Sequence, residues 1–317
     1  MRKLLINLLI TSMVAQALYG QITAPDGNQL PFTLKPLGHG VYAAIDDAKG
    51  DAGANAGFVI GDDGVAVIDT FEHEAAAKAL FSEIRKLSPL PIKYVINTHY
   101  HLDHVAGNKL FEDAGAVILA QANVHSWIHT ENLKFFGKNI TPAQKAEVEN
   151  LAAPEIVYNT GIDLYLGKRR LIVRVLPGHT GGDSIVRIPD ADITFCGDLF
   201  WRKTLPNLID ATTSRWMGSL KTIQEYGVSG TYVPGHGDVG TMADVAAFQA
   251  YLSDLREWTA SAIKDGKTGD ALLSAVMPYL QGKYGTWNFF SYFAKRNVQD
   301  MAAEIRGDKR VPKPVSQ

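Results

Sequence analysis

The feature that most constrains this chain is the stretch THYHLDHVAG, which runs from Thr98 to Gly107. It carries three histidines and an aspartate within six positions, and it follows the apolar run IKYVIN, which predicts a buried strand. Imidazole nitrogens and carboxylate oxygens are both zinc ligands in proteins. The fold must therefore present this loop at the end of a strand, next to the rest of a metal site.

The spacing of these four residues divides them between two positions. Side chains alternate along an extended chain, so His99 and His101 fall on one side and can share an ion. Asp103 and His104 follow where the chain turns toward a predicted helix, so we expect them to point to a neighbouring position. The loop predicts one half of each of two adjacent metal sites.

Three further candidate ligands follow distant apolar runs. His179 lies in LPGHTGGD, Asp198 ends DITFCGD, and His236 lies in VPGHGD. A glycine precedes each of them, which lets the backbone approach closely. These segments are expected to supply the other half of the metal site.

In their order along the chain, HYHLDH, PGHTGGD, CGD and PGHGD resemble the motifs of the metallo-β-lactamase superfamily. This resemblance implies an α/β fold, a four-layer αββα sandwich with a metal pair at one edge of the sheets. It implies two zinc ions, although some members use iron or manganese. The implied ligands are His99, His101 and His179 for the first metal, Asp103, His104 and His236 for the second, and Asp198 as a bridge, with Asp69 as a support behind them.

Two rounds of short apolar runs followed by helical patterns also favour two packed sheets between helical layers. From Thr241 onward the pattern is almost purely helical. Since no Pro- or Ser-rich linker precedes it, we expect residues 241–317 to form a helical extension packed on the main domain, residues 18–240.

The first 17 residues have the pattern of a secretory signal peptide. Arg2 and Lys3 precede an apolar run from Leu4 to Val14, which is too short to span a bilayer, and Ala15-Gln16-Ala17 offers a small-residue cleavage site. Cleavage there leaves 29 of 31 basic residues against 33 acidic ones, a formal charge of −4 that argues against nucleic-acid binding. Cys196, the only cysteine, excludes an internal disulfide. These features predict a periplasmic or secreted protein without a membrane anchor, and leave the oligomeric state open.

The chemistry implied by a metal pair is hydrolysis, because two metals can share a water and lower its pKa toward about 7. We expect attack on a small ester, lactone, thioester or lactam, with Asp103 and Asp198 as the catalytic aspartates and Asp103 as a proton acceptor. Aspartate at 198 resembles glyoxalase II and lactonases, whereas export favours a dedicated periplasmic metallo-β-lactamase. The remaining alternatives are a noncatalytic metal-binding protein on this fold and a mono-iron persulfide dioxygenase.

Substrate contacts are predicted only from proximity along the chain. Trp201, Arg202 and Lys203 follow Asp198, and either cation is a candidate to hold a substrate carboxylate; solvated loop charges are the alternative. Other candidates for walls of the site are, after VIDT, Phe71 and His73, and, in the helical extension, Tyr284 and Trp287. The remaining histidines lie outside any ligand pattern: His39, His125 and His129.

Overall fold

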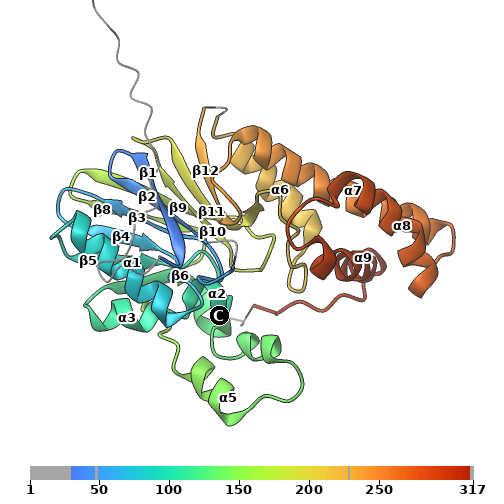
Figure 1. The fold of residues 1–317 in the computed structure, drawn as a ribbon, viewed down its shortest axis with the longest axis horizontal. Helices are drawn as coiled ribbons and strands as arrows, with labels where there is room; N and C mark the ends of the chain where they lie inside the picture. The colour runs from blue at the N-terminus through green and yellow to red at the C-terminus, as the bar shows by residue number, and fades with distance from the viewer. Residues whose placement is uncertain (1–29, 47–48, 228, 315–317) are drawn as a thin grey trace, which may run out of the picture.

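The computed structural model describes residues 30–46, 49–227 and 229–314, so the predicted signal peptide lies outside the described residues. Two β-sheets pack against each other, with helices on the outer face of each (Figure 1). The predicted αββα sandwich with C-terminal helices is confirmed.

The first sheet has seven strands in chain order. Its first four strands pair antiparallel and the last four pair parallel. The strands are β1 (Phe32–Gly38), β2 (Val41–Asp46), β3 (Ala56–Ile60), β4 (Val65–Ile68), β5 (Ile92–Ile96), β6 (Val117–Gln121) and β7 (Ile156–Tyr158).

The second sheet has five strands in the order β12-β11-β10-β9-β8. Only β11 and β12 pair in parallel, so their carboxyl ends meet at one edge. The strands are β8 (Gly161–Leu166), β9 (Arg169–Val175), β10 (Ser184–Ile188), β11 (Ile193–Trp201) and β12 (Thr231–His236).

Alternation along the strands produces the layers. In β4, Ala66 and Ile68 join the core between the two sheets, whereas Val65 and Val67 face the helices on the outer side. That outer layer consists of α1 (Glu74–Leu87) and α3 (Asn108–Asp113). Burial on both faces explains why β4 is apolar at every position rather than alternating.

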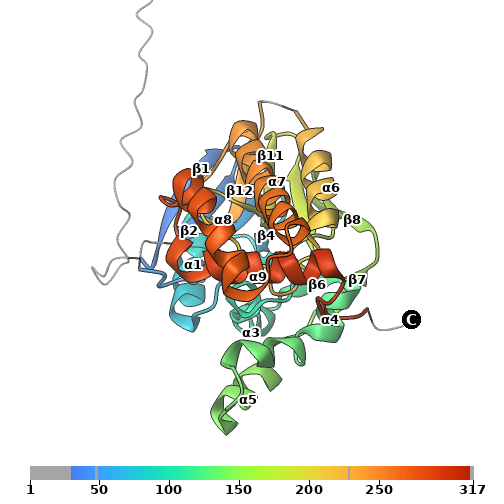
Figure 2. The ribbon, with the colours of Figure 1, turned by 90° about the vertical axis from the view of Figure 1, so that its right-hand side faces the viewer.

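The second outer layer consists of four helices from the C-terminal part of the chain: α6 (Thr213–Gln224), α7 (Met242–Lys264), α8 (Gly269–Tyr284) and α9 (Phe290–Arg306). These helices share one buried core with β11, through residues such as Phe200, Trp216, Phe248 and Met301. Figure 2 shows α7, α8 and α9 lying across this side of the sandwich. The C-terminal helices thus complete the core of the second sheet.

The connection from β5 to β7 carries the remaining helices, which lie near the edge of the sheets: α2 (Leu102–Val105), α4 (Ala122–Trp127), the 3-10 helix η1 (Glu131–Phe136) and α5 (Pro142–Glu149). Figures 1 and 2 show α5 projecting from the sandwich. Its start is fixed by a capping box between Thr141 and Gln144, with Pro142 in the first turn. Among the helices in the described part of the chain, none combines the length and apolarity needed to cross a membrane.

Candidate metal centre

The histidine stretch leaves the carboxyl end of β5 and turns directly into the short helix α2. Asn97 fixes this turn: its side chain and that of Asn108 exchange hydrogen bonds of 2.9 Å in each direction. Both amides are fully buried, so these hydrogen bonds also satisfy polar groups that burial would otherwise leave unpaired. The loop is therefore held from beneath by α3.

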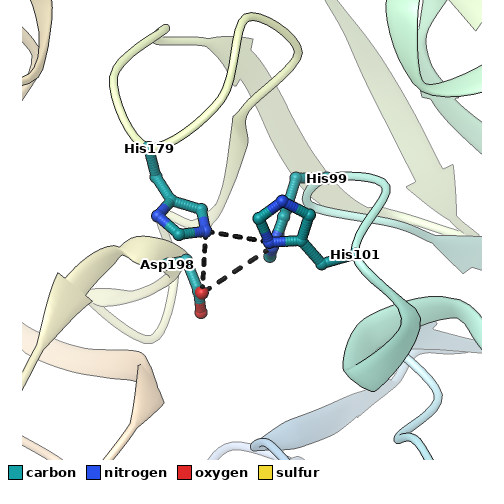
Figure 3. Close-up of side chains that lie close together, drawn as sticks. All are labelled: His99, His101, His179 and Asp198. Carbon is teal, nitrogen blue, oxygen red and sulfur yellow. Dashed lines mark hydrogen bonds and ion pairs between the residues drawn. The ribbon is translucent and has the colours of Figure 1, made fainter. Parts of the chain in front are cut away.

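The first group of ligands consists of His99, His101 and His179, gathered around Asp198 (Figure 3). His179 reaches the group from the loop between β9 and β10, and its Nε2 lies 3.1 Å from Asp198 Oδ2 and 3.0 Å from His101 Nδ1. His99 Nε2 lies 3.7 Å from the same carboxylate oxygen. All four side chains are buried.

The second group lies beside the first and consists of Asp103, His104 and His236. His236, at the end of β12, has its Nε2 3.2 Å from Asp103 Oδ2. His104 Nε2 lies 3.6 Å from that oxygen. In contrast to the first group, this one includes a carboxylate that is 26% exposed, Asp103.

Asp198 lies between the two groups, with one oxygen toward each. Its Oδ2 faces His99 and His179, whereas its Oδ1 lies 3.1 Å from His104 Nε2 and 3.5 Å from His236 Nε2. This is the arrangement expected of a carboxylate that bridges two ions.

Glycines allow the strands to converge on Asp198. A Cβ at Gly235 would lie 1.9 Å from Asp198 Oδ1, so a side chain there would occupy the bridging position. Gly197 has a φ of +51°, and a Cβ there would meet Thr98 Oγ1 at 2.5 Å. Close approach thus requires glycine at both positions.

Asp69 holds the second group from behind. Its carboxylate lies 2.8 Å from His104 Nδ1 and accepts hydrogen bonds from Thr98 N and Oγ1. Asp69 is itself in the left-handed region at φ 57°, a strained conformation of the kind that collects at functional sites. The interaction turns His104 Nε2 toward Asp198.

Asp210 plays the same part for the first group, although no motif in the sequence marks it. Its Oδ2 lies 3.0 Å from His101 Nε2, which leaves Nδ1 of that ring facing His179. Tyr100 and Lys134 also donate to Asp210. A carboxylate behind a ligand histidine fixes its ring orientation and raises its basicity as a ligand.

Two more buried residues that sequence reasoning missed hold the ligand loops. Asp183, the last residue of HTGGD, accepts hydrogen bonds from Gly178 N and Thr180 N, which closes the loop that carries His179. Asn55 donates through Nδ2 to Pro234 O and Gly237 O and so clamps the loop around His236. The motif HTGGD was a usable signal for Asp183, whereas no motif in the sequence marked Asn55.

The site fits metal ions by its donor chemistry. Within each group the ligand atoms all lie within 4.8 Å of one another. Three buried nitrogens point into the site without a well-formed hydrogen bond from any described residue: His99 Nε2, His104 Nε2 and His236 Nε2. Buried polar atoms normally have partners, so these nitrogens are positioned for a ligand that the chain itself does not provide.

The electrostatics differ between the groups. Burial lowers the pKa of His99 well below its usual range, and burial also lowers the pKa of His101. Against the opposing effect of burial, Asp198 and its neighbouring carboxylates raise the pKa of His104 well above its usual range and that of His236 to about 9. The histidines in turn hold the pKa of Asp198 well below its usual range despite burial.

Comparison with known proteins identifies the source of this geometry. The sequence profile of the Metallo-beta-lactamase superfamily matches residues 50–236, more than half of the chain and the whole span of the ligands. The chain belongs to the metallo-β-lactamase superfamily. The prediction made from the motifs is confirmed.

Relatives within this superfamily have several activities. Metallo-beta-lactamase type 2 of Bacillus cereus is 27% identical over 206 residues, which are 63% of this chain and 73% of that protein. A linear primary-alkylsulfatase of a Pseudomonas species is 22% identical over 71% of this chain and 52% of the relative. Hydroxyacylglutathione hydrolase of Brucella ovis is 26% identical over 42% of this chain and 43% of the relative. The chain thus spans about half or less of the last two relatives.

Among solved structures, a metallo-beta-lactamase from Pontibacter korlensis is similar with a TM-score of 0.59. The match covers 70% of this chain and 99% of that one at 20% identity, which supports the shared fold. The profile match and the relatives above place the chain in a superfamily of metal-dependent hydrolases, as predicted.

A cavity of about 460 Å³ opens onto the metal centre of this metallo-β-lactamase fold. Trp201 lines it as predicted: its ring stacks on His236 at a centroid distance of 3.9 Å, and its Nε1 donates to Asp198 O. The other lining residues are Gly53, Glu72, His101, Leu102, Asp103, Phe135, Phe136, Asp198, Asn207, His236, Phe289, Tyr292 and Phe293.

Four of the residues predicted to contact substrate do not line this cavity: Phe71, His73, Arg202 and Lys203. Phe71 is fully buried and stacks on Phe32 in the core of the first sheet. His73 is exposed at the start of α1. Arg202 turns away to Asp244, 3.1 Å from its Nε, and Lys203 is exposed.

The helical extension does supply a wall of the cavity, but through other residues than expected. Tyr284 and Trp287 pack on Tyr251 inside the helical core. Phe289, Tyr292 and Phe293, at the start of α9, line the cavity instead. The run WNFFSYF, residues 287–293, was the signal in the sequence.

Proposed function

We propose that this chain is a dinuclear zinc hydrolase that opens a small ester, lactone, thioester or lactam. The observation that carries the proposal is Asp198, whose two oxygens face two separate groups of histidines beside a cavity. Zinc ions bound there would supply an activated nucleophile and polarise the substrate carbonyl.

The chain's own residues have separable parts in this reaction. His99, His101 and His179 would hold the first ion, and Asp103, His104 and His236 the second. Asp103 would be the proton acceptor, since its carboxylate lines the cavity and is 26% exposed. Trp201 covers His236 and keeps water from that side of the site.

The test is metal content by plasma mass spectrometry on protein purified without added metal, together with initial rates. The substrates are a chromogenic aryl ester, a lactone, a thioester and nitrocefin. Two zinc ions with ester or lactone turnover supports the proposal, and dominant turnover of nitrocefin would make the protein a dedicated β-lactamase. One bound iron without hydrolysis would contradict it, as would two bound metals without any turnover.

A second candidate is hydrolysis of the sulfate ester of an apolar alcohol. The similarity to a linear primary-alkylsulfatase extends over 71% of this chain, and the cavity beside the metal centre is largely aromatic. Release of sulfate from octyl sulfate, measured by ion chromatography, distinguishes this reaction from attack on a carboxylic ester.

Export to the periplasm or medium is part of the proposal and rests on the signal-peptide pattern of residues 1–17. N-terminal sequencing of the protein recovered from a periplasmic extract tests it. A mature chain beginning at Leu18 supports export, and an intact N-terminus in the cytoplasmic fraction contradicts it.

A further inference from the structure

Five aromatic residues of the cavity wall come from two elements that are far apart in the sequence. η1 contributes Phe135 and Phe136, and the start of α9 contributes Phe289, Tyr292 and Phe293. Two of these side chains lie next to ligand histidines. The ring of Phe135 is edge-on to that of His101 at a centroid distance of 4.9 Å, and the ring centroids of Phe289 and His236 are 6.4 Å apart. Both ends of the metal centre are therefore bordered by aromatic rings.

Several of these rings are exposed although they are apolar. Phe135 is 38% exposed, Phe289 48% and Tyr292 72%. Contiguous exposed apolar side chains commonly mark a binding site. A cavity of about 460 Å³ is also in the usual range for small-molecule sites.

Phe289 is held in place at a conformational cost. Its φ of 59° lies in the left-handed region, which a bulky residue rarely adopts. The preceding residue, Asn288, is tied to the segment after β11 by hydrogen bonds from Asn288 N to Lys203 O and from Leu205 N to Asn288 O. The same segment follows Asp198 and Trp201, so the strained turn couples the aromatic wall to the metal centre.

Positive side chains are missing from the lining. None of the described residues that form it is Lys or Arg. The nearby cations have other partners: Lys134 donates to Asp210 and Tyr100, and Arg202 pairs with Asp244. Apart from the aspartates and histidines of the metal centre, the charged residue of the lining is an acid, Glu72.

From this lining we propose that the cavity selects a substrate whose reacting group is joined to an uncharged apolar group, alkyl or aryl, and rejects one with a second, remote carboxylate. The proposal rests on the proposed hydrolase function. Apolar groups would be removed from water against the aromatic walls, whereas a remote carboxylate would lose water without meeting a cation and would face Glu72.

A matched pair of esters tests the proposal on the metal-loaded protein. p-Nitrophenyl octanoate and the mono-p-nitrophenyl ester of octanedioic acid differ only by the remote carboxylate. Hydrolysis of each adds one water, breaks the acyl C–O bond and releases a carboxylic acid and p-nitrophenol. We expect kcat/KM to be about tenfold or more higher for the octanoate, because a buried, unpaired charge is costly. Equal values, or a preference for the octanedioate, would overturn the proposal.

Variants locate the effect in the cavity. Phe289→Ala and Phe135→Ala should each lower the ratio of kcat/KM for p-nitrophenyl octanoate to that for p-nitrophenyl acetate about fivefold. Each variant removes aromatic contact with the long acyl chain, which the acetate lacks. Tyr165→Ala, on the edge strand β8, is the matched control, since Tyr165 is 54% exposed and does not line the cavity. Glu72→Gln should raise the ratio of octanedioate to octanoate turnover. The proposal fails if the control variant changes chain-length preference as much as the two phenylalanine variants do.

A binding measurement separates this inference from the proposed function. The neutral fluorophore N-phenyl-1-naphthylamine should bind the metal-free protein, and Phe289→Ala and Phe135→Ala should weaken its binding while Tyr165→Ala does not. Binding with this pattern but without ester turnover would leave the apolar cavity standing and reject the hydrolase. Ester turnover without selective binding of the fluorophore, or without a preference for the octanoate, would reject the apolar substrate site but would still support the hydrolase function.

Discussion

The two halves of the metal centre are built differently. In the first, His99, His101 and His179 are at most 5% exposed, and Asp210 holds His101 from behind. In the second, His104 is buried and held by Asp69, but Asp103 and His236 are 26% and 8% exposed and line the cavity. The first half is the more deeply buried, and His101 alone of its three histidines lines the cavity, whereas both Asp103 and His236 of the second half line it.

The same difference appears in proton affinity. In the first half, burial lowers the pKa of His99 and of His101, so both rings are neutral ligands near pH 7. In the second half, carboxylates raise the pKa of His104 and His236, so these rings hold protons until a metal displaces them. The first half is thus ready to bind a metal, whereas the second half must release protons when it binds one.

The largest expected effect is at the residue that the two halves share. Asp198→Ala removes a charged ligand from both groups, so we expect loss of both metals and a fall in turnover of about a hundredfold or more, since even supporting residues are worth about 10- to 100-fold. Metal analysis and initial rates measure this. Asp190→Ala is the control, because Asp190 is exposed and pairs with Arg169 away from the site. Retention of one metal by Asp198→Ala would show that it is no bridge.

A large but one-sided effect is expected from single ligand histidines. His179→Ala should abolish tight binding at the first site, because it removes a buried nitrogen beside Asp198 Oδ2. His236→Ala should leave the first metal in place and remove the second, because His236 contacts Asp103 and Asp198 Oδ1. Zinc titration calorimetry resolves the two events. Identical titrations of the two variants would show that His179 and His236 do not belong to separate metal sites.

A smaller effect is expected from the carboxylates behind the ligands. Asp210→Asn should weaken the first site, and Asp69→Asn the second, each by about 10- to 100-fold in metal affinity. These isosteric changes keep a hydrogen-bond acceptor and remove the charge. Competition with a zinc chelator measures the affinities, and thermal unfolding of the metal-free variants checks that the fold survives. If both variants weaken the same site, the supports are not divided as the structure implies.

Much of the fold was predictable because its signals are local. The strand at IKYVIN and the helices after Thr241 followed from an apolar run and from the helical pattern of the sequence. β1 was missed because Pro36 interrupts the pattern, which an edge strand tolerates. β7 was missed because it has only 3 residues and its first two are exposed, so its pairing with β6 decides its structure.

The ligands were predictable for a different reason than their surroundings. A metal needs particular donors, so His99, His179 and Asp198 mark themselves by residue type. The residues that support the ligands or line the cavity need no particular sequence motif; the fold only has to bring them to the site. Asp210 lies in an unremarkable loop, and Arg202, although only four positions after Asp198, turns outward to Asp244. Proximity in sequence was thus a poor guide to the cavity.

The smallest effect is expected in the pH dependence of metal binding, which tests the difference in proton affinity between the two halves of the metal centre. Because the pKa of His236 is raised to about 9 and that of His104 is also raised, the metal-free second site is protonated at neutral pH. Affinity for the second metal should therefore rise with pH toward about 9, by about tenfold per unit for each proton released. The first site should respond less, because the lowered pKa of His99 and His101 leaves them neutral already.

Zinc titration calorimetry near neutral pH and near pH 9, in buffers of different ionisation enthalpy, counts the protons released at each step. His236→Gln is the control, since its second site should release one proton fewer while its first site keeps the same count. Equal proton release at both steps would mean that the neighbouring carboxylates do not keep His104 and His236 protonated in the metal-free protein. The two halves of the metal centre would then differ in solvent exposure alone.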